Sequence, residues 1–281
     1  MPLLSSLDLA GDNVATVNDL LVRDSQILAL SAAAGAEINT GVDFREQVMT
    51  VVSDTTDIVP IGEGVDQTDA DATVTNPKYD VHMWPAWRPV TEQTQRNTSP
   101  LRLAQDQVNA LAPRFPISID KYYMNLIIAG ASVTEVVFNP AQGVDSLKSI
   151  LAEFTSTSYQ ADWFAMTRLG TNELGWNKDG DNRRMNLTEA TGVRVGETGA
   201  VLADKGANRV LGLIGPFGQS SAGIAAGLEM QVFPQVTKDG KGPGNGWVQH
   251  RAMMALGWGN AQATNNDKTI DGAGFVVVTL A

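Results

Sequence analysis

The sequence predicts an α+β fold, on three observations. Apolar residues follow helical spacing in two separate segments, at about residues 16–34 and 145–170. Runs of β-branched residues and alternating aromatics predict strands within residues 46–92. From residue 171 onward, short predicted strands are separated by turns rich in Gly, Asn and Asp. Helices and strands do not alternate regularly, so a parallel sheet built from βαβ units is not expected.

The chain begins with an expected arm and helix, together residues 1–45. The arm shows no clear period, and Thr16 can cap the helix that follows, which Gly35 would end. The apolar stripe of this helix includes Leu20 and Leu21. That stripe needs a cover, which either the chain's own core or a neighbouring subunit would supply.

Residues 46–92 are expected to form a long two-stranded excursion. Strand patterns flank a polar stretch, Gly62 to Pro77, that carries four acidic residues and has little to bury. This stretch is too long for an ordinary hairpin loop. An isolated two-stranded ribbon is only marginally stable in water, so the excursion is expected to lie on another surface.

The remainder is expected to contain a long helix and a turn-rich body. Asp145 can cap a helix that continues to Gly170 and would span roughly 36 Å at 1.5 Å per residue. Residues 115–138 are strongly apolar, and their periodicity leaves both a strand and a buried helix open. Further strands are predicted at 193–195, 209–214, 231–236 and 274–280, and short helices near 221–229 and 247–256.

The net charge of −11 is confined to the first 80 residues. They contain 14 acidic and three basic residues, whereas residues 81–281 contain 17 of each sign. Such an asymmetry indicates that the two parts have different partners. An acidic chain lacks the clustered Lys and Arg that phosphate contacts need. Arg88 and Arg96 are therefore expected to pair with acidic groups of proteins.

Composition excludes several kinds of site. Without cysteine the chain has no disulfides, thiolate zinc sites, Fe–S clusters or cysteine nucleophiles. The two histidines, His82 and His250, have no metal-ligand spacing, so neither a metal nor a cofactor is expected. No segment reaches the roughly 18 to 20 apolar residues of a membrane helix, and the N-terminus lacks the basic start of a signal peptide. A cytoplasmic location, or a particle assembled there, is expected.

Ser220 is the best catalytic candidate. It lies in a Gly-rich turn after a predicted strand, and Asp239 and His250 follow it in the order of a hydrolase triad. Only about 30 residues separate Ser220 from His250, and no doubly wound α/β pattern precedes the serine. An ordinary turn is therefore favoured and no enzyme is expected, while a cytoplasmic serine hydrolase stays open as an alternative.

The order of these parts resembles the major capsid protein of tailed phages, which has the HK97 fold. The matches are positional: an arm, a long β-excursion, a long helix and a turn-rich body. The resemblance implies an N-terminal arm and helix at 1–45, an extended β-hairpin called the E-loop at 46–92, a P-domain at 93–194 with a spine helix at 145–170, an A-domain at 195–265, and a C-terminal strand at 266–281 that returns to the P-domain.

The resemblance also implies a function. The protein would be a structural subunit that self-assembles into an icosahedral shell enclosing double-stranded DNA. Its partners would be other copies of itself, in hexamers and pentamers, and scaffolding, portal or decoration proteins, with no sequence-specific DNA binding and no membrane. It would belong to the virion and be assembled in the host cytoplasm. A phage tail-tube or capsid decoration protein stays open, because it would share the acidity, the absence of cysteine and the long loop.

Subunit contacts are expected where charge is unevenly distributed. An acidic arm and excursion lying on the neutral body of the next subunit would gain electrostatic complementarity. The subunit-contact residues expected on this basis are Asp8, Asp12, Leu20, Leu21, Glu63, Asp66, Asp69, Asp71, Arg88 and Arg96.

Overall fold

A computed structural model of the chain describes residues 25–54, 72–97, 113–142, 161–175, 193–236 and 246–281, together with residues 106, 110, 146 and 188. The helices are α2 (Gln26–Ala33), α3 (Glu92–Asn97), α5 (Arg114–Ala129), α7 (Arg168–Gly175) and the 3-10 helix η1 (Phe217–Gln219). The strands are β1 (Glu37–Thr40), β2 (Gln47–Val48), β3 (Val51–Asp54), β4 (Ala72–Thr75), β5 (Lys78–Tyr79), β6 (His82–Thr91), β7 (Thr134–Phe138), β8 (Trp163–Thr167), β9 (Arg194–Thr198), β10 (Arg209–Gly215), β11 (Ser220–Val236), β12 (Trp247–Asn260) and β13 (Val276–Leu280). Among these residues, no helix combines the length and the apolar character needed to span a bilayer.

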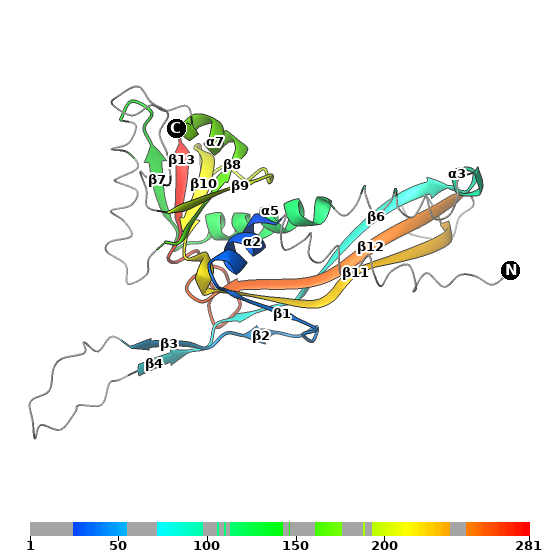
Figure 1. The fold of residues 1–281 in the computed structure, drawn as a ribbon, viewed down its shortest axis with the longest axis horizontal. Coiled ribbons are helices and arrows are strands. Elements are labelled where there is room, and N and C mark those ends of the chain that lie inside the picture. Colours follow the sequence, from blue (N-terminus) through cyan, green and yellow to red (C-terminus); the bar gives the residue numbers. More distant parts are fainter. Residues whose placement is uncertain are drawn as a thin grey trace, which may run out of the picture.

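A four-stranded sheet, in the order β1-β11-β12-β6, forms one long extension of the molecule (Figure 1). β12 pairs antiparallel with both β11 and β6, while β1 pairs parallel with the first residues of β11 only. At about 3.3 Å per residue, the 14 residues of β12 span roughly 46 Å. The sheet therefore extends well beyond the helices α2 and α5, and α3 lies at its far end.

A five-stranded mixed sheet, in the order β7-β13-β10-β8-β9, forms the second part of the molecule. Its central strand β10 is buried from Val210 to Gly215, which requires cover on both faces. Gly170 of α7 lies so close to β10 that a Cβ there would be 2.0 Å from the carbonyl oxygen of Leu211. Only glycine permits this approach of helix to sheet.

The main core joins the two sheets through α2 and α5. On α5, the buried residues Ile119, Tyr123 and Ile127 recur at helical spacing and form one apolar face. They share a buried cluster with Leu213 of β10 and Trp258 of β12. The two sheets are therefore packed around common helices.

The first helix starts later than predicted. Ser25 has an extended backbone and its Oγ accepts a hydrogen bond from the N–H of Leu28, so Ser25 is the N-cap of α2. The predicted cap Thr16 lies outside the described residues. The predicted end is confirmed, because Gly35 follows the helix with a φ of 96°.

The predicted helix at 145–170 is wrong in its second half. Trp163–Thr167 form β8, which pairs with β10 and β9. Phe164, Ala165 and Met166 are all buried, so this segment faces protein on both sides. A short continuous apolar run of this kind fits a central strand as well as a buried helix, and sheet pairing decides between them. The longest described helix is instead α5, within the segment 115–138 where helix and strand both stayed open.

The short helices predicted near 221–229 and 247–256 are also wrong, because both segments are strands, in β11 and β12. The strands predicted at 193–195, 209–214 and 274–280 are confirmed in β9, β10 and β13.

The expected body unit 195–265 is divided between the two sheets. β10 belongs to the five-stranded sheet, whereas β11 and β12 belong to the four-stranded sheet. The final strand β13 pairs with β10 on one side and, in parallel, with β7 on the other. Boundaries drawn along the sequence therefore do not coincide with the two sheets.

Candidate functional site

A two-stranded ribbon projects from the body at the side of the molecule where β2 to β5 lie (Figure 1). β2 pairs with β5 and β3 pairs with β4, both antiparallel. The predicted excursion is therefore confirmed for residues 47–54 and 72–79, and its tip lies outside the described residues. Its expected end at residue 92 is corrected, because β6 leaves the ribbon and pairs with β12 in the four-stranded sheet.

The ribbon exposes apolar side chains along its length. Val48 on β2 and Val74 on β4 are each more than half exposed, and so is Phe44, three residues before β2. A ribbon of two strands has no core in which to place them. These exposed apolar groups are available for contact with another protein surface.

The root of the ribbon packs tightly on the four-stranded sheet. Tyr79 is buried there, and its hydroxyl lies 3.1 Å from Oγ of Ser221; burial raises the pKa of Tyr79. A Cβ added to Gly259 would lie 2.7 Å from the Tyr79 ring and 3.0 Å from Met49. Gly259 therefore allows the ribbon to cross β12 at close range.

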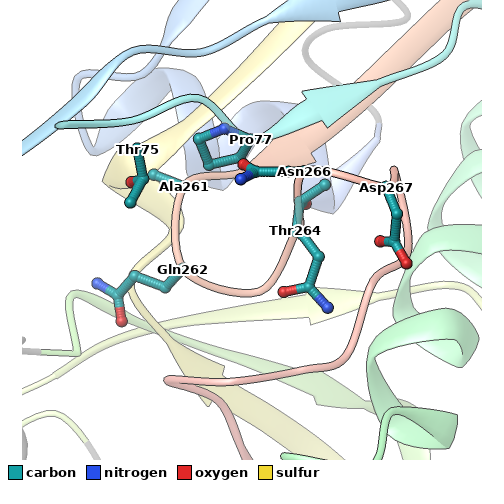
Figure 2. Close-up of a pocket in the computed structure, with 8 residues that line it drawn as sticks. Thr75, Pro77, Ala261, Gln262, Thr264, Asn266 and Asp267 are labelled. Atoms are coloured by element: carbon teal, nitrogen blue, oxygen red, sulfur yellow. The ribbon is translucent and has the colours of Figure 1, made fainter.

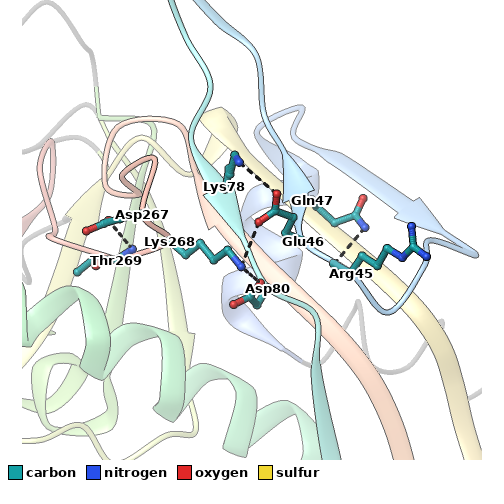
Figure 3. Close-up of polar contacts among 8 residues, drawn as sticks. All are labelled: Arg45, Glu46, Gln47, Lys78, Asp80, Asp267, Lys268 and Thr269. Atoms are coloured by element: carbon teal, nitrogen blue, oxygen red, sulfur yellow. Dashed lines mark hydrogen bonds and ion pairs between the residues drawn. The ribbon is translucent and has the colours of Figure 1, made fainter.

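A chain of ion pairs surrounds this root (Figure 3). Each carboxylate oxygen of Glu46 pairs with one lysine. Lys78 Nζ lies 3.1 Å from Oε1, and Lys268 Nζ lies 3.1 Å from Oε2. Lys268 Nζ also lies 2.8 Å from Asp80 Oδ1. Hydrogen bonds from Lys268 and Lys78 hold the pKa of Glu46 below its ordinary value. All four groups are open to solvent, so each pair contributes little to stability.

An open hollow of about 480 Å³ lies next to the root (Figure 2). Its lining consists mainly of hydroxyl and carboxamide side chains and includes one carboxylate: Thr75, Pro77, Ala261, Gln262, Thr264, Asn265, Asn266 and Asp267. No group of three His, Cys, Asp or Glu side chains within the described ranges could hold a metal ion. The hollow offers hydrogen bonds to a partner and no constellation for catalysis.

The edge strand β6 carries a second exposed apolar face. Trp84 and Ala86 alternate with exposed residues and pack against the core, whereas Met83 and Trp87 on the opposite face are more than half exposed. A proline at residue 85 lies between them, and proline is tolerated in an edge strand where its nitrogen faces away from the sheet. Because this nitrogen has no hydrogen, it cannot help to add a further strand. A partner is therefore favoured at the face of β6 over its edge.

The expected contact residues fall largely outside the described ranges. Arg88 is exposed on β6, opposite His250 of β12, and Arg96 lies in α3 at the far end of the sheet. The remaining candidates lie outside the described residues: Asp8, Asp12, Leu20, Leu21, Glu63, Asp66, Asp69 and Asp71.

The fold does not bring together Ser220 and His250, the pair on which the hydrolase alternative depends. Ser220 begins β11, is buried, and its Oγ accepts a hydrogen bond from Nδ2 of Asn260 at 3.0 Å. His250 lies ten residues before Asn260 along the same strand, which places it roughly 33 Å away. Asp239 lies outside the described residues. A serine and a histidine this far apart cannot exchange a proton.

Sequence reasoning missed the ion pairs at the root. Glu46 and Lys268 are 222 positions apart in the chain, and each is an ordinary charged residue in a polar stretch. Only the fold brings them together, so no local pattern could have found them.

Comparisons with known proteins point to phage structures. No family model matches the chain, and no curated protein matches it. Among solved structures, a chain from Gordonia phage Cozz matches with a TM-score of 0.60 and 15% identity, over 92% of this chain and 87% of that one. A chain from Microbacterium phage Oxtober96 matches with a TM-score of 0.61 and 13% identity, over 89% and 90%. A chain from the capsid of an empty GTA particle matches with a TM-score of 0.61 and 15% identity, over 90% of each. The chain therefore has the fold of these phage chains and of the GTA capsid.

Proposed function

We propose that the chain is the major capsid subunit of a tailed phage and self-assembles into an icosahedral shell that encloses double-stranded DNA. One observation carries the proposal: the fold matches a chain from the capsid of an empty GTA particle over 90% of each chain, and the body bears a ribbon with no core of its own. Such a ribbon gains a stable environment when it lies on a neighbour. Repetition over many subunits makes individually weak contacts sufficient.

The partners in this proposal are other copies of the chain, arranged as hexamers and pentamers. Scaffolding, portal and decoration proteins are further partners, and the virion is the location after assembly in the host cytoplasm. DNA is enclosed without sequence-specific binding, because a net charge of −11 does not favour phosphate contacts.

In the terms of the HK97 fold, α5 takes the role of the spine helix that the sequence pattern placed at 145–170. It follows the ribbon in the chain and packs beneath the four-stranded sheet, through Tyr123 and Trp258. The four-stranded sheet with α5 would be the P-domain, and the five-stranded sheet would be the A-domain.

Negative-stain electron microscopy of the purified full-length protein, alone and with its scaffolding protein, tests the proposal. Closed shells are expected. Rings or tubes would favour the tail-tube alternative, and a stable monodisperse monomer under all assembly conditions would contradict the proposal.

A further inference from the structure

Lys268 has an unusual backbone conformation. Its φ of 72° lies in the left-handed region, where glycine and asparagine are common and a long side chain is not. Among the described residues it is the only one other than glycine with a positive φ. A lysine held there indicates that its side chain has a task at this position.

The ammonium group of Lys268 connects the body to both limbs of the ribbon. Glu46 directly precedes β2, and Asp80 directly follows β5, so the two carboxylates lie on opposite limbs of the root. Lys268 Nζ lies 3.1 Å from Oε2 of Glu46 and 2.8 Å from Oδ1 of Asp80 (Figure 3). One cation therefore bridges the two limbs.

The turn that carries Lys268 is firmly held. The backbone N–H of Asn265 donates to the carbonyl of Thr269 at 2.9 Å, and the N–H of Lys268 donates to the carbonyl of Asn265 at 3.0 Å. The Asp267 carboxylate accepts the N–H of Thr269 at 3.1 Å. This turn belongs to the connection between β12 and β13, so it moves with the body.

We propose that Lys268 is an electrostatic clamp that sets the angle between the ribbon and the body. Besides the packing of Tyr79 and Met49 on Gly259, the N–H of Lys78 donates to the carbonyl of Asn265 at 3.4 Å, so the contacts between ribbon and body gather at one root, where Lys268 joins both limbs. The pairs are exposed and therefore weakened by salt, so the clamp can be released without unfolding. The proposal concerns the single subunit and stands whether or not the chain forms shells.

Distance measurements between two spin labels test the clamp in the full-length chain. The chain has no cysteine, so cysteines at Val74 on β4 and at Val201 in the body take the labels specifically. Both positions are exposed. Lys268→Asn removes the ammonium group and introduces a residue that tolerates the left-handed backbone. Glu46→Gln removes the carboxylate that both lysines share.

The labelled parent is expected to give a single narrow distance peak at low salt. Lys268→Asn and Glu46→Gln should each broaden that peak, and high salt should broaden it in the parent and in any variant that keeps the ion pairs. Lys268→Gly, which also relieves the backbone, should behave like Lys268→Asn and melt no lower than the parent. Arg45→Gln changes a neighbouring charge outside the cluster and should keep the peak. A peak as narrow as the parent's in both Lys268→Asn and Glu46→Gln, or a broadened peak in Arg45→Gln, would overturn the proposal.

Discussion

Asp120 ties the N-terminal end of α2 to α5 and to the end of β9 through one buried carboxylate. Its oxygens accept hydrogen bonds from Ser25 Oγ at 2.6 Å, the N–H of Gln26 at 2.9 Å, Thr198 Oγ1 at 3.0 Å and the N–H of Ile27 at 3.1 Å. The carboxylate thus caps α2 from a different helix and satisfies N–H groups that a helix start leaves free.

Asp120→Ala is expected to destabilise the subunit strongly. The change leaves several buried donors without an acceptor, each at a cost of roughly 1–3 kcal/mol. The free energy of unfolding, measured by urea denaturation, should therefore fall by at least that amount. Asp204→Ala removes an exposed carboxylate and should change it by less than about 0.5 kcal/mol. Equal effects of the two substitutions would show that Asp120 does not hold α2.

His250 makes stability depend on pH. It is buried in β12, its Nε2 has no hydrogen-bond partner, and burial lowers its pKa. The unfolded chain therefore gains a proton at this residue below about pH 6.5 that the folded chain resists, and the free energy of unfolding falls as pH decreases. The free energy of unfolding can be measured by urea denaturation at several pH values from about 7.5 to 5.5, which is roughly one unit either side of the ordinary histidine pKa. In His250→Phe the decrease over this range should be smaller. His82→Gln, at the exposed second histidine, should leave the decrease intact; an unchanged slope in His250→Phe would contradict this account.

On the edge strand β6, the proposal of subunit contacts can be tested apart from folding. Met83 and Trp87 lie on the face opposite the core, so Met83→Ser and Trp87→Ser together should change the free energy of unfolding by less than about 1 kcal/mol. Shell yield, measured by sedimentation and electron microscopy, should drop. Val201→Ser, at an exposed position in the five-stranded part, is the matched control and should assemble normally. A lower melting temperature with normal shells would assign Met83 and Trp87 to the core.

The ribbon and several strands of the five-stranded sheet could be predicted because their signals are local. β13 is a β-branched run, β10 is a short apolar run and β9 begins between the alternating Val193 and Val195, while the ribbon's polar stretch is unusually long. The strand predicted at 231–236 is the end of β11, but segments 221–229 and 247–256 could not be recognised as strands, because their pairing partners are distant in the sequence. β11 and β12 also contain glycines at the ribbon's crossing. A Cβ at Gly257 would meet the Asp80 carbonyl oxygen at 2.5 Å, and one at Gly223 would meet Val42 at 3.0 Å. These glycines lower the strand propensity of segments that long-range pairing nevertheless holds as strands.

The sequence predicted that the ribbon would be a contact element, but not which residues form the contacts at its root. Charge asymmetry indicated the ribbon, and exposed Val48 and Val74 lie on it, with exposed Phe44 just before it. The ion pairs of Lys268 join positions from opposite ends of the chain, which composition cannot reveal.

The structure also relocates the boundary between arm and body. Ile27 and Leu28 of α2 are fully buried in the main core, so α2 belongs to the body. A truncation meant to test the arm should therefore stop before Ser25. Removing α2 as well would take three buried apolar side chains, Ile27, Leu28 and Leu30, out of the core, at about 1.5–3 kcal/mol each, and would confuse an effect on folding with one on assembly.

Neutralising the acidic residues between β3 and β4 tests whether the charge of −11 contributes to contacts between subunits. Glu63→Gln, Asp66→Asn, Asp69→Asn and Asp71→Asn in one variant remove four of the 14 acidic residues in the first 80. Because the complementary surface would lie on another copy, shell formation should weaken while the melting temperature of the dispersed subunit stays constant. The difference should shrink as salt rises, since the Debye length falls to about 3 Å at 1 M. Glu197→Gln with Asp204→Asn, at exposed positions of the body, should assemble like the parent. A lower melting temperature with unchanged assembly would show that these charges stabilise the single subunit and not the contacts between subunits.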